Sequence, residues 1–305
     1  MKLKSTLSIL AITAFATPAL ADCGTVTFSD VGWTDITATT ATTSIVLRAL
    51  GYETDIKVLS VPVTYISLEQ GDVDVFLGNW MPTMEGDIAK YRDAGTVDTV
   101  RANLNGTAYT LATNAAGAEL GIKTFADIAG NADALDGKIF GIEAGNDGNR
   151  IVMDLIDADT FGMGAVEMVE SSEQGMLAQV DRASRKGDPV IFLGWAPHPM
   201  NSNFKVTYLT GGEEWFGEEG DVYTNTRAGY VDECPNVGVL LKNLSFTLAM
   251  ENEIMGAILD EGEDADDAAS AWLKANPDAF SAWLTGVTTK DGGDAVAAVS
   301  AALGL

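Results

Sequence analysis

The sequence predicts an α/β protein built as two lobes with a cleft between them. The chain has 305 residues, more than a single small hydrophobic core requires. Strand-like and helix-like segments alternate along it, and the alternation restarts after Gly106. In each half a continuous apolar strand runs into nearly the same sequence, Phe76-Leu-Gly-Asn-Trp80 in the first and Phe192-Leu-Gly-Trp195 in the second. Such apolar runs are typical of buried parallel strands, so each half should hold its own sheet.

The expected elements of the first half end near residue 93. We expect strands over residues 25–29, 54–59 and 73–77, and helices over 35–50, 63–70 and 84–93. Gly51 should stop the first helix, which is rich in threonine, a poor helix former.

The second half repeats this alternation. We expect strands over residues 109–112, 138–142 and 190–193, with helices starting near 126 and spanning 150–156 and about 172–186. The loop Gly145-Asn-Asp-Gly-Asn149 is rich in turn residues and should lead into the second of these helices. From Val237 onward the chain reads as helical.

The first residues read as an export signal. Lys2 and Lys4 give a positive start, an apolar run follows over residues 7–15, and Ala19-Leu-Ala21 has the small-x-small pattern of a cleavage site. The apolar run is too short to span a bilayer. We therefore expect a signal peptide over 1–21, cleaved near Ala21, and an exported protein of the periplasm.

The two cysteines, Cys23 and Cys234, bear on the path of the chain. In an exported protein a single pair is most simply a disulfide, the alternative being two buried thiols. Such a bridge would return the chain to the lobe where it started, with hinges near Asn105 and Asp221. We therefore expect residues 22–105 and 221–305 to form the first lobe and residues 106–220 the second.

The chain is strongly acidic, with a formal net charge of −26. Nucleic acid is excluded as a partner, because phosphate binding requires a basic surface. The simplest interpretation of the acidity is that it keeps the protein soluble, in a saline environment or in an ordinary one. It would also attract cations weakly, an effect that salt screens.

Three strand ends carry a tryptophan, since Phe28-Ser-Asp-Val-Gly-Trp33 adds a third case to Trp80 and Trp195. In α/β proteins ligands bind in the crevice outside the carboxyl ends of the strands. Several indoles meeting there, with Tyr109 near them, would form a box that attracts a quaternary ammonium ion. Trp272 and Trp283 fall at helical spacing in the tail and should instead pack between helices.

Polar residues near the same strand ends could complete this site. Asp35 lies at the expected start of the first helix, where it could cap the helix, match the charge of a cation and accept a hydrogen bond from a ligand hydroxyl. Asn146 could bind the polar end of a ligand or simply form the turn. Asp147 reads as a helix-start residue.

Signals of catalysis are weak. The one histidine, His198, lies between two prolines, and neither a Gly-x-Ser-x-Gly elbow nor a histidine-based metal pattern is present in the sequence. We expect no enzyme, no catalytic residue, no metal and no cofactor. A secreted hydrolase that uses a carboxylate pair on choline esters stays open as the alternative of another class.

With these motifs the chain resembles the periplasmic choline-binding proteins of bacterial ABC importers, over almost all of the region from Cys23 to Leu305. Further motifs that carry the resemblance are Ser171-Ser-Glu-Gln-Gly-Met176 and the extension of the Trp195 motif to Met200. Ala196, which is often glutamate in such proteins, departs from the pattern outside the cage.

This resemblance implies a set of residue roles and partners. It places an aromatic cage on Trp33, Trp80, Tyr109 and Trp195, assigns Asp35 and Asn146 to the hydroxyl and charge of choline, and implies the Cys23–Cys234 disulfide. It also implies a two-lobed fold with two crossovers, and a membrane permease as partner. We expect a monomer. Glycine betaine, carnitine or trimethylamine N-oxide remain alternative ligands, since each carries a methylated nitrogen.

Overall fold

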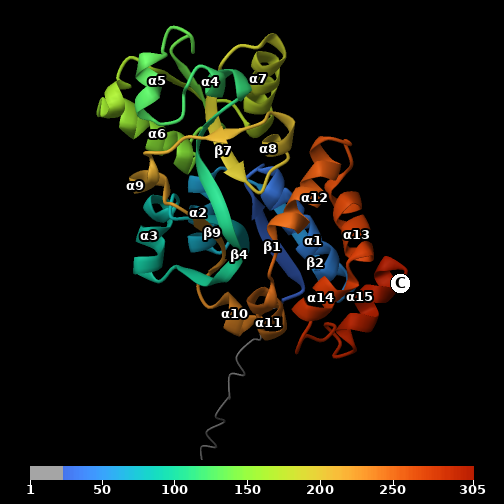
Figure 1. Cartoon of the computed structure of the whole chain (residues 1–305). Helices are drawn as coiled ribbons and strands as arrows, with labels where there is room; N and C mark the ends of the chain where they lie inside the picture. The colour runs from blue at the N-terminus through green and yellow to red at the C-terminus, as the bar shows by residue number, and fades with distance from the viewer. Residues whose placement is uncertain (1–22) are drawn as a thin grey trace, which may run out of the picture.

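The structure, a computed structural model, describes residues 23–305 (Figure 1). The expected export signal and its cleavage site lie outside these residues. The strands form one continuous path in the order β2-β1-β3-β9-β4-β7-β5-β6, with β8 paired to β4. Helices surround the strands in both halves of the molecule. In Figure 1 the teal strand β4 runs from the lower half into the upper half.

The strands are short apart from β4. Their bounds are β1 Thr25–Asp30, β2 Glu53–Val58, β3 Val75–Met81, β4 Val97–Thr113, β5 Lys138–Phe140, β6 Glu167–Val169, β7 Ile191–Ala196, β8 Thr207–Tyr208 and β9 Gly220–Arg227.

The helices fall into three groups along the chain. The first comprises α1 Thr34–Ala49, α2 Val61–Gln70 and α3 Glu85–Ala94. The second comprises α4 Ala115–Glu119, α5 Ala126–Gly130, α6 Asp147–Asp157, η1 Thr160–Gly162, α7 Glu173–Lys186, α8 Met200–Asn203 and α9 Glu213–Phe216. The third comprises α10 Tyr230–Glu233, α11 Pro235–Asn243, α12 Leu248–Leu259, α13 Ala265–Ala275, α14 Pro277–Trp283 and α15 Ala295–Leu303.

Helix α1 lies in the core of the first half despite its threonines. Two of their buried hydroxyls donate to backbone carbonyls one turn back, Thr42 Oγ1 to Ala38 at 2.7 Å and Thr43 Oγ1 to Thr39 at 2.8 Å. These bonds satisfy hydroxyls that would otherwise be costly to bury. The helix therefore tolerates a composition that propensity alone disfavours.

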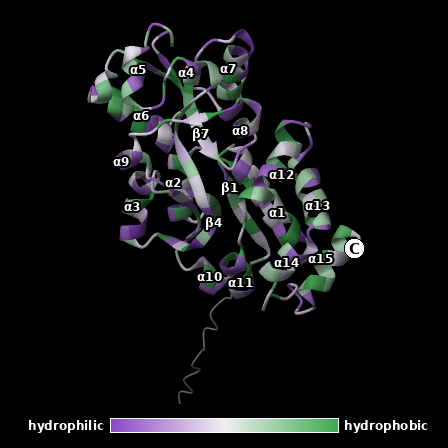
Figure 2. Ribbon diagram, in the orientation of Figure 1, coloured by the Kyte–Doolittle hydropathy of each residue, from purple (hydrophilic) through white to green (hydrophobic). Residues whose placement is uncertain are grey.

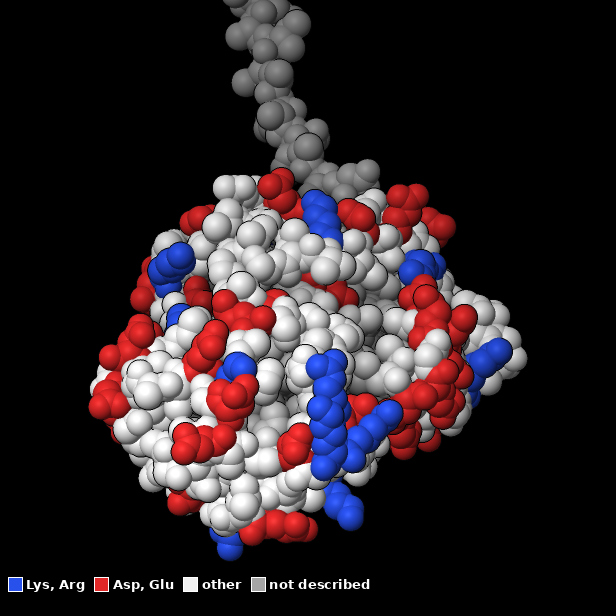
Figure 3. All heavy atoms as spheres, turned by 90° about the horizontal axis from the view of Figure 1, so that it is seen from above, with Lys and Arg blue, Asp and Glu red and all other residues white. Residues whose placement is uncertain are grey.

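The outer helices are amphipathic. In Figure 2 most of them carry hydrophilic and hydrophobic residues along the same ribbon, because one face meets the sheet and the other meets solvent. Acidic side chains are spread over the face seen in Figure 3 and outnumber the basic ones there, as the composition requires. Within the described residues, no helix is both long and apolar enough to cross a membrane.

The two halves of the sheet meet on strand β4. Its residues up to Thr107 pair with β9, and from Ala108 onward they pair with β7. The chain returns at Gly220, where β9 begins. Asn105 Nδ2 donates to Asp221 Oδ1 at 2.8 Å, so the two hinge residues expected from the sequence lie side by side. We propose that residues 22–105 with 221–305 and residues 106–220 move as two lobes about this point.

Several element predictions need correction. The strand expected over 109–112 is the end of the much longer β4, and β9 was not expected at all. Asn105-Gly106, after which the second alternation was expected to begin, lies within β4 as a bulge in which Gly106 adopts a φ of 78°. The strand expected over 138–142 ends at Phe140, which leaves Ile142 beyond the sheet.

A disulfide joins Cys23 to Cys234, with their Cα atoms 5.7 Å apart. It closes a loop with a sequence separation of 211 residues, so the chain-entropy model assigns it about 4–5 kcal/mol. We expect the Cys23→Ser, Cys234→Ser double variant to melt roughly 5–10 °C below the wild type in differential scanning calorimetry. As the control, a reductant should lower the wild-type melting temperature and leave the variant unchanged. Equal melting of the two proteins would contradict this stabilisation.

Candidate functional site

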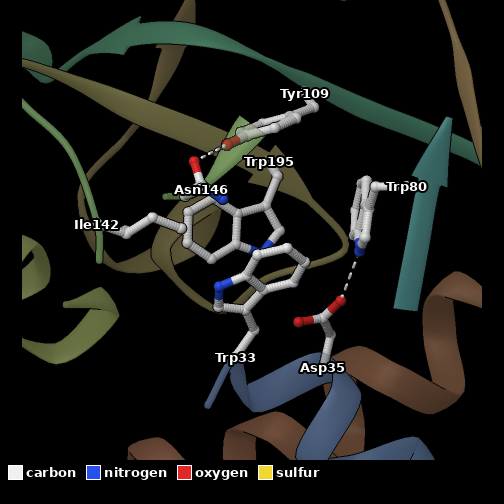
Figure 4. Close-up of a pocket in the computed structure, with 7 residues that line it drawn as sticks. All are labelled: Trp33, Asp35, Trp80, Tyr109, Ile142, Asn146 and Trp195. Atoms are coloured by element: carbon white, nitrogen blue, oxygen red, sulfur yellow. Dashed lines mark hydrogen bonds between the residues drawn. The ribbon is translucent and has the colours of Figure 1, made fainter. Parts of the chain in front are cut away.

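A pocket of about 240 Å³ lies where the two halves of the molecule face each other (Figure 4). It is lined by all six residues expected from the sequence and one more: Trp33, Asp35, Trp80, Tyr109, Ile142, Asn146 and Trp195. The space is small, and the three indoles that border it are at most 5% exposed. The pocket therefore suits a ligand of a few heavy atoms.

The aromatic walls come from both halves. Trp33 follows β1 and Trp80 lies near the end of β3, whereas Tyr109 on β4 is directly opposite Trp195 on β7 in the strand register. The Tyr109 ring centroid is 6.0 Å from that of Trp80 and 6.2 Å from that of Trp195, both in edge-on arrangements. Figure 4 shows the four rings around a common space. Each half thus brings one pair of aromatic rings.

Asp35 supplies the carboxyl group of the pocket. Its Oδ2 accepts a hydrogen bond from Trp80 Nε1 at 3.0 Å, while its Oδ1 has no hydrogen-bond partner within residues 23–305. The side chain is buried, and this burial, together with the nearby charge of Glu173, raises the pKa of Asp35 to about 8. A cation in the pocket would favour the ionised form.

The expected helix-capping role of Asp35 is not what the structure shows. Helix α1 begins at Thr34, so Trp33 occupies the N-cap position and Asp35 is the second helical residue. Its carboxylate instead holds the indole of Trp80, which fixes the first pair of rings as one unit.

Asn146 combines the two roles considered for it. It is the N-cap of α6, with Oδ1 accepting from the Asn149 backbone N–H at 3.0 Å and from the Tyr109 hydroxyl at 3.2 Å. Its Nδ2 donates to Asp147 Oδ1 at 3.0 Å, which leaves its second amide hydrogen for the pocket. Asp147 is the first residue of α6, as expected, and burial raises its pKa to about 7.

Three residues near the site were missed by sequence reasoning. Ile142 lines the pocket just past the end of β5, a position that the strand-end rule applied to the tryptophans could have found. Glu143 Oε1 accepts from Trp33 Nε1 at 2.8 Å, and burial raises its pKa. Glu173 binds Thr34 across the cleft. Glu173 lies in the motif Ser171-Ser-Glu-Gln-Gly-Met176, but the sequence indicates neither its contact nor that of Glu143, because both contacts depend on how the two halves meet.

The composition of the pocket limits its chemistry. In the described part of the chain, neither lysine nor arginine lines this pocket, and no group of three or more histidine, cysteine, aspartate or glutamate side chains is placed to hold a metal ion. Asp35 is the one carboxylate among the residues that line the pocket in the described chain. The arrangement can enclose a small cation but offers no pair of carboxylates for hydrolysis.

The tryptophans expected outside the site lie among the last helices. Trp283 is buried and donates from Nε1 to the Ser245 carbonyl at 3.1 Å. Trp272 is half-buried on α13 and donates to Glu253 Oε2 on α12 at 2.7 Å. Both therefore pack between helices.

Comparisons with known proteins agree with this architecture. A solved structure of an ABC-transporter choline binding protein in complex with choline is 67% identical, covering 92% of this chain and 98% of that chain with a TM-score of 0.91. The unliganded semi-closed conformation of an ABC-transporter choline binding protein is also 67% identical, covering 93% of this chain and 99% of that chain, with a TM-score of 0.85. The present structure is thus nearer to the liganded conformation.

More distant relatives extend the comparison. An uncharacterized protein, ORF1, of Chromohalobacter salexigens is 47% identical over 150 residues, which is 48% of this chain and 97% of that protein. The family model OpuAC, described as the substrate binding domain of ABC-type glycine betaine transport systems, matches residues 24–275. The chain therefore belongs to the OpuAC family of substrate-binding proteins of ABC transporters, which are not enzymes.

Proposed function

We propose that this protein captures choline in the periplasm, in the cage of Trp33, Trp80, Tyr109 and Trp195, and delivers it to the permease of an ABC importer. The observation that carries the proposal is Asp35 Oδ1, a buried carboxylate oxygen without a partner among the described residues, set within four aromatic rings. A cation with an adjacent hydroxyl satisfies both features.

The aromatic walls suit the trimethylammonium group of choline. This group has no hydrogen to donate, so it cannot be held by hydrogen bonds. Each ring face stabilises such a cation by roughly 0.5–2 kcal/mol once water is excluded. The three indoles are at most 5% exposed, so the pocket is dry enough for the upper part of that range.

The polar residues favour choline over glycine betaine. The ionised form of Asp35, which a cation favours, would repel a betaine carboxylate beside it, because like charges in a dry pocket repel strongly. Within residues 23–305, moreover, no lysine or arginine lines the pocket to bind that carboxylate. The choline hydroxyl, in contrast, can donate to Asp35 Oδ1 and accept from the spare amide hydrogen of Asn146.

The relatives support the same ligand and partner. The 67% identical protein is a choline binding protein with choline bound, and the family serves ABC transporters, which implies a membrane permease as partner. Neither comparison supports the hydrolase considered from the sequence. We propose that the protein works as a monomer, released by cleavage near Ala21.

Calorimetric titration of the ligand-free mature protein with choline, and then with glycine betaine, tests the ligand. We expect tight binding of choline and weak binding of betaine, and a smaller ratio of the two affinities in Asp35→Asn because the like-charge repulsion is removed. Tight betaine binding with weak choline binding would overturn the assignment of choline while keeping the fold. An unchanged ratio in Asp35→Asn would show that selectivity does not come from this carboxylate.

A further inference from the structure

Glu173 is a buried carboxylate that joins the two halves of the molecule away from the lining of the pocket. It is the first residue of α7, in the second half, yet both of its oxygens bind Thr34 in the first half. Oε2 accepts from the Thr34 backbone N–H at 2.8 Å, and Oε1 accepts from Thr34 Oγ1 at 2.6 Å. Glu173 is 1% exposed, so these bonds form in a dry interface.

The contact gives α1 the cap that its own sequence lacks. The N-cap residue is Trp33, whose indole is a donor and cannot accept from the first backbone N–H groups of the helix. A carboxylate at a helix N-terminus satisfies such a donor and interacts favourably with the helix dipole. Here the carboxylate comes from the opposite half, so α1 is capped only while the two halves are together.

A histidine links the same carboxylate to the cage. His198 Nδ1 accepts from the Met200 backbone N–H at 2.9 Å, which places the ring hydrogen of neutral His198 on Nε2. Nε2 lies 3.2 Å from Glu173 Oε1 and can donate to it. The His198 ring also packs edge-on against Trp195, with ring centroids 5.0 Å apart. Glu173 thus connects the start of α1, next to Trp33 and Asp35, with the ring of Trp195.

We propose that Glu173 is a positioning residue for ligand capture, which holds the cleft closed by capping α1 from the second lobe. The proposal rests on the proposed function, because the closed cleft is the one that encloses choline.

The charge of Glu173 also acts on Asp35. Closure brings the two carboxyl groups close enough for the charge of Glu173 to help raise the pKa of Asp35. A cation beside Asp35 offsets the repulsion that arises when both carboxyl groups are ionised. The bonds to Thr34 then hold the cleft closed, so removing them should affect release of the ligand more than its entry.

Stopped-flow measurement of choline association and dissociation tests the proposal, with Glu173→Gln compared to the wild type. We expect choline to dissociate about tenfold faster from the variant, since charge-assisted hydrogen bonds become neutral ones, with an association rate nearly unchanged. The matched control is Asp181→Asn, which neutralises a half-exposed carboxylate on the same helix, paired with Arg185. It should leave both rates unchanged.

A second variant separates positioning from folding. Thr34→Val removes the hydroxyl that Glu173 binds from the other side of the cleft, so the dissociation effects of Glu173→Gln and Thr34→Val should be strongly non-additive. Additive effects, or a wild-type dissociation rate in a folded Glu173→Gln protein, would overturn the proposal. Absence of choline binding by the wild type would instead overturn the proposed function. Small-angle scattering of the ligand-free wild type and of ligand-free Glu173→Gln would then compare the closure of the cleft directly. Equal radii of gyration there would also overturn the role of Glu173.

Discussion

Replacing Trp80 by Ala should weaken choline binding by about tenfold or more. Two losses add up in this variant. One ring face of the cage disappears, and the Asp35 carboxylate loses the hydrogen bond that it accepts from Trp80 Nε1. Water would also enter the space left by the indole, which weakens the attraction between the cation and the remaining rings.

Titration calorimetry with choline measures this loss, and two further variants locate its cause. Trp80→Phe keeps an aromatic face but removes the donor to Asp35, so its affinity should fall between those of the wild type and Trp80→Ala. Trp272→Ala removes an indole on α13 that donates to Glu253, away from the pocket, and should bind choline as the wild type does. Unchanged affinity in Trp80→Ala would remove this residue from the cage.

Choline affinity should also rise with pH until about pH 8. Burial and the charge of Glu173 raise the pKa of Asp35 to about this value. The sign follows from the charge of the ligand. A cation binds the ionised carboxylate more tightly, so choline lowers the pKa of Asp35 and binding releases a proton. Below the pKa that Asp35 has in the ligand-free protein, the choline affinity should fall by up to about tenfold for each pH unit. Above this pKa the affinity should level off.

Titrations between about pH 6 and pH 9, repeated in buffers of different ionisation enthalpy, measure both the affinity and the released proton. Asp35→Asn is the control, because its amide does not titrate and its affinity should depend little on pH. Glu251 on α12 also interacts with Asp35 and has a raised pKa because of burial, so Glu251→Gln distinguishes its contribution. A pH-independent wild-type affinity would mean that Asp35 is already ionised in the ligand-free protein.

Local sequence patterns went far in predicting which residues line the pocket. Trp33, Trp80 and Trp195 each follow a strand pattern and a glycine, and the structure brings all three to one pocket with Tyr109, Asp35 and Asn146. That prediction needed only the rule that ligands bind outside strand ends. It worked because each side chain is placed by its own strand, with little dependence on distant segments.

Features that depend on long-range pairing were not predictable in this way. The first part of β4 is rich in polar residues and contains Asn105-Gly106, which usually forms a turn between strands. Pairing with β9, more than 100 residues later, holds it in an extended form instead. Likewise Glu173 sits in a motif that reads as an ordinary helix start, and only the approach of Thr34 from the other half shows what its carboxylate binds.

The returning path of the chain also decides how closure could be observed by fluorescence. Cys23 is bridged to Cys234, and α15, which carries the last residues, packs on α1, α13 and α14, so both ends of the described chain belong to the same half. A donor and an acceptor dye attached at the two ends would therefore keep their separation whether the cleft is open or shut. A dye at Asp133, an exposed position between α5 and β5, paired with one near Leu305 would span the hinge and convert the protein into an optical sensor of its ligand.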